Sequence, residues 1–270
     1  MNTVTTVTSE AVRQAADRLF EAGRTGIPAS PVREMIGPCD VDVAYQVQEL
    51  NTKRALEAGR RLVGRKIGLT SLAVQKQLGV DQPDYGMLFA DMARSDGEEI
   101  SLKDLMQPKV EAEIAFVLER DIESDQPTFA DLFLAIAYAV PAVEIVGSRI
   151  ANWDIKISDT IADNASSGLY VLGSMPRRLD AGGFDLRSCE MMMEKAGLKV
   201  STGTGAACLG SPLNAALWLA RIMARTGRPL RAGDTVLSGA LGPMVPVTPG
   251  DVFDVHIDGI GGVRASFSKE

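Results

Sequence analysis

Three glutamates in two apolar segments are the residues whose type and spacing point most directly to chemistry. In the segment Val110–Leu118, Glu111 and Glu113 alternate with apolar residues, and this alternation predicts a β-strand. The two carboxylates then lie on one face, about 7 Å apart for a rise near 3.3 Å per residue. Ala115 and Val117 follow on the same face, which indicates that other parts of the chain cover it.

A third carboxylate has a similar setting, because Glu144 is flanked by apolar residues in the segment Ala142–Val146. Carboxylates that share a desolvated site repel one another, so one must bind a proton or a cation must join them. If the two strands are neighbours, the three glutamates offer only oxygen ligands, which favours Mg²⁺ or Mn²⁺ over zinc. Three protein ligands leave about half of an octahedral shell for water or a chelating substrate. Spacing alone leaves an alternative equally open, in which Glu111 and Glu113 line a solvated face and Glu144 pairs with an arginine.

Lys66 is a second candidate, because Gly64 and Gly68 share its strand face in the segment Leu62–Leu69 and clear space around the ammonium group. A lysine in such a slot can bind a carboxylate or transfer protons. The alternative is a surface lysine whose stem packs on the protein. Asp84 lies in a turn-rich stretch, where it is either a base or a turn former.

The stretch 163–168 concentrates small polar side chains, Ser166 among them, just before an expected strand. These side chains either hold a substrate carboxylate or cap and turn the chain. His256 is the single histidine and alternates with Asp254 and Asp258, so we expect a surface histidine paired with these acids. One histidine also excludes a His-rich zinc site, and any Ser–His or Cys–His mechanism that does not use His256.

Turn and capping signals divide the chain into an N-terminal helical arm or subdomain, residues 1–60, and a metal-binding catalytic domain, residues 61–270. Helical spacing predicts one helix capped by Ser9 and ending at Gly23, and a second from Asp40 to Gly59. Many short strands with few helices indicate an α+β fold on a folded or rolled mixed sheet. The expected strands are Leu62–Leu69, Val110–Leu118, Ala142–Val146, Gly168–Leu172, Glu190–Glu194, Leu198–Ser201, Thr235–Ser238, Val252–Ile257 and Val263–Phe267, with a hairpin turn at Ala196-Gly197. The expected helices among them are Ser71–Leu78, Thr128–Ala139 and Pro212–Thr226.

Composition narrows the class of protein further. The chain has 270 residues, of which 46% are hydrophobic, and a formal net charge of −7 without a basic block, so nucleic acid is a poor partner. Three cysteines without a CxxC pattern fit a reducing cytoplasm rather than a disulfide framework. The N-terminus does not read as a signal peptide, and no apolar stretch approaches the roughly 20 residues that cross a bilayer.

Four stretches carry a resemblance to a known family: GRKIGLTSLAVQKQLGVDQPDYGMLFADM (64–92), QPKVEAEIAFVLERDI (107–122), PAVEIVGSRIANWDIKISDTIADNASSGLYVLG (141–173) and LSGALGPMVPVTPGD (237–251). With them the chain resembles the 2-hydroxypenta-2,4-dienoate hydratases (2-keto-4-pentenoate hydratases) of bacterial aromatic meta-cleavage pathways, in the fumarylacetoacetate hydrolase superfamily. Together with the helical N-terminal segment, the likeness covers nearly the whole chain.

The resemblance implies a mixed β-roll core and a homo-oligomer, with possible association with other pathway enzymes. It implies a metal site for Mg²⁺ or Mn²⁺ at Glu111, Glu113 and Glu144. It also implies catalytic or substrate-binding roles for Lys66, Asp84 and Ser166 in adding water to a small 2-oxo acid.

Three other functions remain as alternatives. A sister decarboxylase acting on 2-oxohex-3-enedioate (4-oxalocrotonate) resembles the hydratases closely and uses the same kind of metal site. A carbon–carbon hydrolase of the wider superfamily generally relies on a His–Glu dyad, which a single histidine in a late strand disfavours. A non-catalytic homologue or scaffold partner is disfavoured by the intact glutamates and Lys66.

Overall fold

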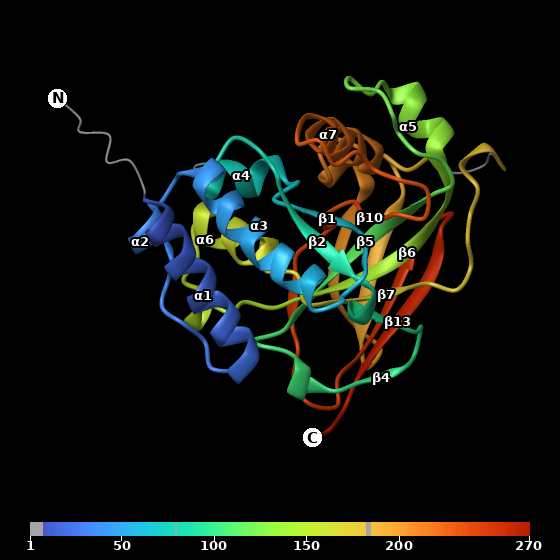
Figure 1. The fold of residues 1–270 in the computed structure, drawn as a ribbon. Helices are drawn as coiled ribbons and strands as arrows, with labels where there is room; N and C mark the ends of the chain where they lie inside the picture. Colours follow the sequence, from blue (N-terminus) through green and yellow to red (C-terminus); the bar gives the residue numbers. More distant parts are fainter. Residues whose placement is uncertain (1–7, 79, 182–184) are drawn as a thin grey trace.

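The computed structural model describes residues 8–78, 80–181 and 185–270. Two β-sheets form the centre of the molecule, and helices gather on one side of the larger sheet (Figure 1). The larger sheet runs in the order β2 (Asp84–Phe89), β1 (Leu62–Gly68), β10 (Thr235–Leu237), β5 (Lys109–Leu118), β6 (Ile136–Val146), β7 (Leu169–Leu172) and β3 (Ala93–Arg94), and β11 (Val245–Pro246) also pairs with β5. The smaller sheet runs β4 (Glu99–Ile100), β13 (Gly261–Phe267), β12 (Val252–Ile257), β8 (Glu190–Lys195) and β9 (Leu198–Thr204).

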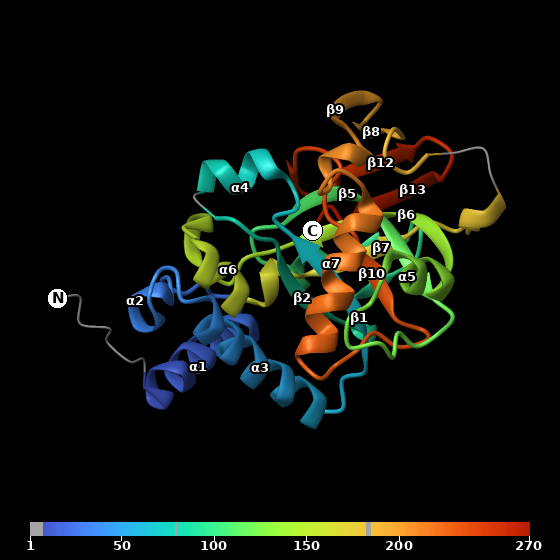
Figure 2. The ribbon, with the colours of Figure 1, turned by 90° about the horizontal axis from the view of Figure 1, so that it is seen from above.

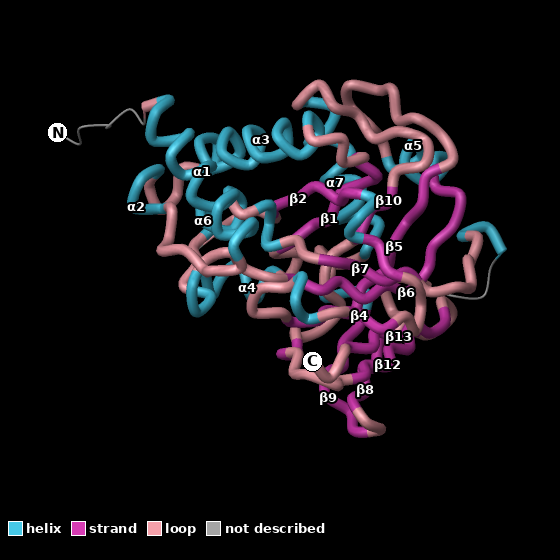
Figure 3. The backbone as a smooth tube through the Cα atoms, turned by 60° about the horizontal axis from the view of Figure 1, so that its bottom comes forward, coloured by secondary structure: helices cyan, strands magenta, loops and turns pink. Residues whose placement is uncertain are grey.

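Both sheets mix parallel and antiparallel pairs. Strand β1 is parallel to β10, β3 to β7 and β4 to β13, whereas the other ladders are antiparallel. Strands β12 and β13 pack against β6, and the hairpin of β8 and β9 projects on the side away from the N-terminal helices (Figure 3). The combination of mixed sheets and few helices confirms the expected α+β class.

The helices divide between two hydrophobic clusters. One cluster is built around the two sheets and α7 (Pro212–Arg225), which lies against β1 (Figure 2). The other joins α1 (Ser9–Thr25), α2 (Arg33–Ile36) and α3 (Val41–Glu57) to α6 (Ile157–Ala162). Because α6 belongs to the second part of the chain, the division at residue 60 stays a prediction.

The shorter elements are α4 (Leu72–Leu78), α5 (Phe129–Ala135), η1 (Ala90–Met92), η2 (Leu102–Asp104), η3 (Ala151–Trp153), η4 (Asn164–Ser166), η5 (Leu179–Ala181) and η6 (Gly205–Ala207). No helix of the described chain is both long and apolar enough to pass through a membrane.

Local sequence patterns predicted the ends of several helices and strands correctly. Asp40 caps α3 by accepting from the backbone N–H of Val43 at 3.1 Å. Ala196 and Gly197 both have positive φ, 51° and 75°, and connect β8 to β9 as the expected two-residue hairpin. The first helix differs in detail, because Thr8 rather than Ser9 caps it and it runs past Gly23 to a left-handed Gly26.

The predicted helix Thr128–Ala139 is wrong beyond Ala135. Helix α5 starts close to the expected position, with Thr128 as its N-cap, but strand β6 begins at Ile136. The run 132–139 is rich in alanine and leucine, which favours a helix locally. Strand β6 nevertheless pairs with β5 along almost its whole length, down to Ile136 opposite Leu118, and this non-local pairing outweighs the local preference. The turn-rich stretch that contains Asp84 likewise becomes strand β2, which sequence analysis missed.

Gly64 marks the closest backbone approach between β1 and β10. A Cβ atom there would lie 1.9 Å from the carbonyl oxygen of Thr235, so Gly64→Ala must push the two strands apart and should destabilise the fold by about 3 kcal/mol. Gly97 has φ of +76° but open space around it, so Gly97→Ala should cost only about 1–2 kcal/mol. Urea unfolding of both variants checks this order, and equal losses would contradict the close-approach argument.

Candidate metal and substrate site

The pairing of β5 with β6 brings the three glutamates together. Glu111 lies directly opposite Glu144 in the antiparallel register, and Glu113 is two residues further along β5 on the same face. One carboxylate oxygen from each of the three residues lies within 4.8 Å of the others. Residues 33 positions apart in the chain therefore form a single acidic cluster, which we call the carboxylate triad.

The carboxylate triad is buried and short of hydrogen bonds. Glu113 and Glu144 have no exposed surface, and Glu111 is half-buried. The backbone N–H of Gly239 donates to Glu113 Oε2 at 2.9 Å. Glu113 Oε1 and Glu144 Oε2 have no hydrogen-bond partner in the described part of the chain, and Glu144 Oε1 is paired only with the Lys66 ammonium. Unpartnered, converging carboxylate oxygens of this kind are the donor set that a hard divalent cation requires, so the residues fit such an ion.

Electrostatics supports the same interpretation. Burial raises the pKa of Glu111 to about 7, and Lys66 offsets this shift only in part. Burial and repulsion from Glu144 and Glu111 raise the pKa of Glu113 well above its usual range. Without a cation, Glu111 and Glu113 therefore tend to be protonated. A bound cation would instead favour their charged carboxylate forms.

Lys66 is a buried cation beside the carboxylate triad, so the surface-lysine alternative is wrong. Its side chain is 2% exposed, and its Nζ lies 2.8 Å from Glu144 Oε1. The same Nζ donates to the carbonyl oxygen of Ala165 at 3.0 Å. Although burial lowers the pKa of Lys66, the surrounding carboxylates outweigh it and raise the pKa above the usual range. The arginine pairing considered for Glu144 is thus replaced by a lysine pairing.

Asp84 is the first residue of β2, opposite Gly68 on β1. Its carboxyl is fully buried, and neither oxygen has a hydrogen-bond partner among the residues that the structure describes. A Cβ atom at Gly68 would lie 2.2 Å from Asp84 Oδ1, so the glycine makes room for the carboxyl group. Burial raises the pKa of Asp84 to about 6, against the opposing effect of Lys66. A carboxyl with such a pKa can gain or lose a proton near neutral pH.

Ser166 ends the short turn η4, which contacts both β1 and β2. Its side chain is 5% exposed, and its Oγ lacks a hydrogen-bond partner within the described residues. Its carbonyl oxygen accepts from the N–H of Gly147 at 2.9 Å, which ties the turn to the end of β6. The structure therefore gathers all six candidate residues around β1, β2, β5, β6 and η4.

His256 is exposed, as expected, and its Nε2 lies 3.6 Å from Asp258 Oδ1. Sequence reasoning missed the backbone groups of the site, the N–H of Gly239 and the carbonyl of Ala165, because backbone groups leave no side-chain signal. It also missed the pair of partly exposed Arg149 and buried Asp163, which secures η4. A signal was present there, since Asp163 opens the small polar stretch 163–168.

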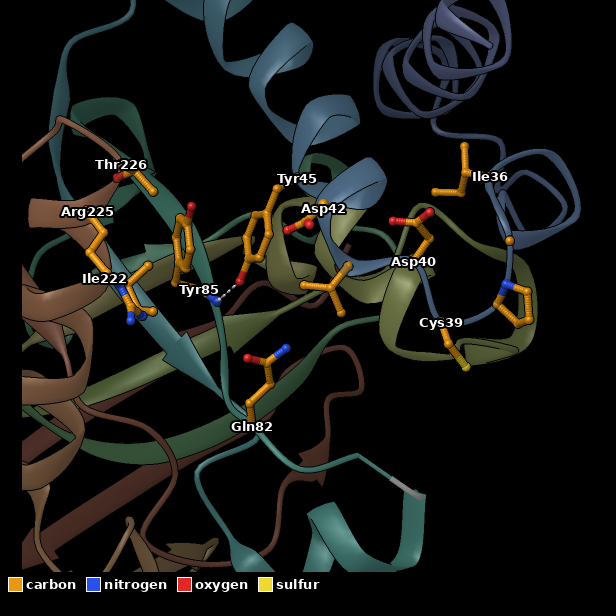
Figure 4. Close-up of a pocket in the computed structure, with 13 residues that line it drawn as sticks. Ile36, Cys39, Asp40, Asp42, Tyr45, Gln82, Tyr85, Ile222, Arg225 and Thr226 are labelled. Carbon is orange, nitrogen blue, oxygen red and sulfur yellow. Dashed lines mark hydrogen bonds between the residues drawn. The ribbon is translucent and has the colours of Figure 1, made fainter. Parts of the chain in front are cut away.

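A large cavity of about 930 Å³ lies between α2, α3 and the end of α7 (Figure 4). Tyr45 stacks on Tyr85 in its wall, with ring centroids 4.4 Å apart, and Tyr85 N–H donates to the Tyr45 hydroxyl at 3.3 Å. Tyr85 follows Asp84 in β2, so their side chains point to opposite faces. None of the six candidate residues lines this cavity, and it is separate from the candidate site.

Comparison with known proteins gives the class of protein that this fold and site define. The family profile described as "Fumarylacetoacetate (FAA) hydrolase C-terminal" matches residues 47–268. Among solved structures, 4-oxalocrotonate decarboxylase from Pseudomonas putida G7, complexed with magnesium and adipate, superimposes with a TM-score of 0.91 at 35% identity, covering 97% of this chain and 99% of that chain. The chain belongs to the fumarylacetoacetate hydrolase family, and its expected rolled mixed-sheet fold is confirmed.

Two curated relatives are more similar to this chain in sequence than the decarboxylase is. The "TodF product hydratase" of Pseudomonas putida is 70% identical over 269 residues, covering 100% of both chains. The "2-keto-4-pentenoate hydratase" of Paraburkholderia xenovorans is 57% identical over 263 residues, covering 97% of both chains. The family resemblance inferred from the four stretches of sequence is therefore confirmed.

The raised pKa of Glu111 predicts how the metal-free protein responds to pH. Its folded-state pKa of about 7 exceeds the ordinary 4.5, so its contribution to stability is full below about pH 4.5 and is lost as pH rises through 7. We expect the urea midpoint of chelator-treated protein to fall between pH 5 and 8, and to fall less in Glu111→Gln. Glu98→Gln, at an exposed carboxyl whose pKa is lowered, should retain the wild-type slope. An unchanged slope in Glu111→Gln would contradict the shift.

Proposed function

We propose that the chain is a metal-dependent hydro-lyase that adds water to 2-hydroxypenta-2,4-dienoate (2-oxopent-4-enoate) and forms 4-hydroxy-2-oxopentanoate in aromatic catabolism. The observation that carries the proposal is the buried carboxylate triad beside Lys66, in a chain 57% and 70% identical over nearly its whole length to named hydratases. The 4-oxalocrotonate decarboxylase, at 35% identity, is less similar in sequence, which favours hydration over decarboxylation.

Glu111, Glu113 and Glu144 would hold the cation, Mg²⁺ or Mn²⁺. Three oxygen ligands and no histidine or cysteine suit these hard ions, and the solved decarboxylase relative is described with magnesium. When bound, the ion supplies Lewis acidity that lowers the cost of negative charge on the 2-oxygen of the substrate.

The reaction requires protons to move at defined atoms, without any oxidant or reductant. A proton first leaves the 2-hydroxyl group and one joins the terminal carbon, which converts the dienol into a conjugated enone. Water then adds across the remaining carbon–carbon double bond, so that its oxygen joins carbon 4 and a proton joins carbon 3. Each of these transfers is faster with a side chain that can exchange a proton near neutral pH.

We assign the proton transfers and the stabilisation of negative charge on the substrate to Lys66 and Asp84. The Lys66 ammonium is fixed by Glu144 and the Ala165 carbonyl, and it can bind the substrate carboxylate or stabilise enolate charge. Asp84, with a pKa near 6, can accept and return a proton. Ser166 has a buried, unpartnered hydroxyl that can orient the substrate carboxylate or the attacking water.

We also propose that the protein assembles as a homo-oligomer that can associate with other enzymes of the pathway. Apolar side chains on the surface of α5 support assembly, since Phe129, Phe133 and Leu134 are 45%, 37% and 62% exposed. Exposed apolar clusters of this kind mark contact surfaces in many proteins. Sedimentation velocity of the full chain would test the assembly.

The function is tested directly by mixing the purified protein with Mg²⁺ or Mn²⁺ and freshly prepared 2-hydroxypenta-2,4-dienoate. We expect loss of the dienol absorbance and formation of 4-hydroxy-2-oxopentanoate, identified by mass spectrometry. Chelator treatment should abolish turnover, because the carboxylate triad then lacks its cation. Full activity after chelation would contradict the metal dependence. Release of carbon dioxide from 2-oxohex-3-enedioate, with no hydration of the dienoate, would assign the decarboxylase instead.

Two substitutions separate metal binding from chemistry. Glu144→Gln removes one charge from the triad, so calorimetry should show at least about tenfold weaker Mn²⁺ binding, while burial of a neutral amide leaves the fold intact. Lys66→Ala leaves all three carboxylates in place, so Mn²⁺ should still bind, whereas kcat should fall about 100-fold or more. Glu119→Gln, at a partly exposed residue just beyond β5, is the matched control. Wild-type kcat in Lys66→Ala would remove this lysine from the reaction.

A further inference from the structure

The turn η4 has an unusual backbone. Asn164, Ala165 and Ser166 have φ values of 54°, 51° and 57°, so three successive residues other than glycine adopt the left-handed conformation. This conformation costs roughly 1–2 kcal/mol for a residue with a Cβ, and asparagine tolerates it best of the three. Runs of such residues persist only where surrounding contacts hold them. The contacts that hold η4 therefore indicate what the turn does.

Asn164 provides the main contact between η4 and β2. Its Oδ1 accepts from the N–H of Met87 at 2.7 Å, and its Nδ2 donates to the carbonyl of Met87 at 3.0 Å. Strand β2 ends the larger sheet, so the outward backbone groups of Met87 have no neighbouring strand to bind. The Asn164 carboxamide makes the two hydrogen bonds with Met87 that a peptide group of a neighbouring strand would otherwise make. We call this pair of hydrogen bonds the amide clamp.

The backbones of β2 and η4 are in close contact beside the amide clamp. A Cβ atom at Gly86 would lie 2.3 Å from the carbonyl oxygen of Asn164, so strand and turn touch directly. That carbonyl also accepts from Ser167 Oγ at 2.8 Å and from Ser167 N at 3.0 Å. Behind the turn, Arg149 donates to the carbonyl oxygens of Ser167 at 2.9 Å and Asp163 at 2.6 Å.

The turn carries one group that contacts Lys66 and, at the next residue, a buried hydroxyl. The carbonyl of Ala165 accepts from Lys66 Nζ at 3.0 Å, and the buried Oγ of Ser166 lacks a partner within the described chain. Strand β2 carries Asp84, three residues before Met87. The amide clamp thus joins the segment that positions Lys66 and Ser166 to the strand that positions Asp84.

We propose that Asn164 is a positioning residue for the reaction. Its carboxamide holds η4 against β2, so that Lys66, Asp84 and Ser166 keep a fixed arrangement beside the carboxylate triad. The inference rests on the proposed hydratase function, because its consequence is a rate. A displacement of about 1 Å at such a site can lower a rate about 100-fold, whereas the triad lies on β5 and β6 and makes no contact with the Asn164 carboxamide among the described hydrogen bonds.

Variants at Asn164 should still fold. Asn164 lines a second cavity, of about 460 Å³, between the N-terminal helices and η4. Water in this cavity can reach the backbone groups of Met87 when the carboxamide is removed, and it would replace the two hydrogen bonds at little net cost. The substitution therefore alters position more than stability.

The experiment compares three variants. Asn164→Gly keeps left-handed freedom but loses the amide clamp, Asn164→Ala loses both, and Asn164→Asp keeps the acceptor for Met87 N–H but loses the donor. We expect kcat to fall about 10- to 100-fold in the Gly and Ala variants and less in the Asp variant. The Mn²⁺ affinity should change less than about threefold, because all three carboxylates of the triad are intact.

Asn152→Ala is the matched control, because Asn152 is also left-handed, with φ of 58°, but is exposed and lies in η3. It should lose similar backbone stability and retain wild-type kcat. Hydrogen exchange of the metal-free protein adds a readout independent of activity: the Met87 amide should exchange faster in the Gly and Ala variants and stay protected in the Asp variant.

The outcomes separate the two proposals. Wild-type protein that leaves the dienoate unchanged overturns the hydratase function and, with it, the role of Asn164 in that reaction. If the wild type turns over and Asn164→Gly retains the wild-type kcat, the reaction requires only that residue 164 can adopt the left-handed conformation. The positioning role of the Asn164 side chain is then wrong. The positioning role is also wrong if Asn152→Ala loses as much kcat as the Asn164 variants do. It is equally wrong if the Met87 amide exchanges at the wild-type rate in the Gly and Ala variants.

Discussion

Mutual repulsion of three carboxylates withdrawn from water is the constraint on which the rest of this structure depends. The register of β5 with β6 sets Glu111 opposite Glu144, and burial raises the pKa values of Glu111 and Glu113. A fold optimised only for stability would place apolar side chains there. One buried lysine offsets part of the charge, and the charge that remains is what suits the triad to the divalent cation that we propose.

The second requirement is close approach of backbone to side chain around that charge. Gly68 leaves room for the Asp84 carboxyl, Gly239 donates its N–H to Glu113, and Ala165 presents its carbonyl to Lys66. These contacts come from β1, the segment after β10, and η4, which are far apart in the chain. The site therefore depends on the packing of the whole larger sheet, and the left-handed residues of η4 include Ala165, whose carbonyl group meets the buried ammonium group.

Relatives of this family share the fold at very different sequence identities, and the site explains why function can differ among them. The decarboxylase structure matches with a TM-score of 0.91 at only 35% identity. Stabilising enolate charge next to a cation serves both hydration and decarboxylation of 2-oxo acids. The difference between the two reactions must then lie in how protons, water and the substrate are placed. Lys66, Asp84 and Ser166 are the residues that we propose for the placement of protons and water.

The sequence by itself determined the alternation that puts Glu111 and Glu113 on one strand face, the α+β class, the cap of α3, the hairpin turn at Ala196-Gly197, and the family. These depend on local spacing or on long shared stretches. Only the tertiary structure decided that Glu144 lies opposite Glu111, that Lys66 is buried, that residues after Ala135 form β6 instead of helix, and that Asn164 clamps β2. Each of these is set by pairing between distant segments, whose free energy exceeds the local preference of any short stretch, and no local pattern encodes that pairing.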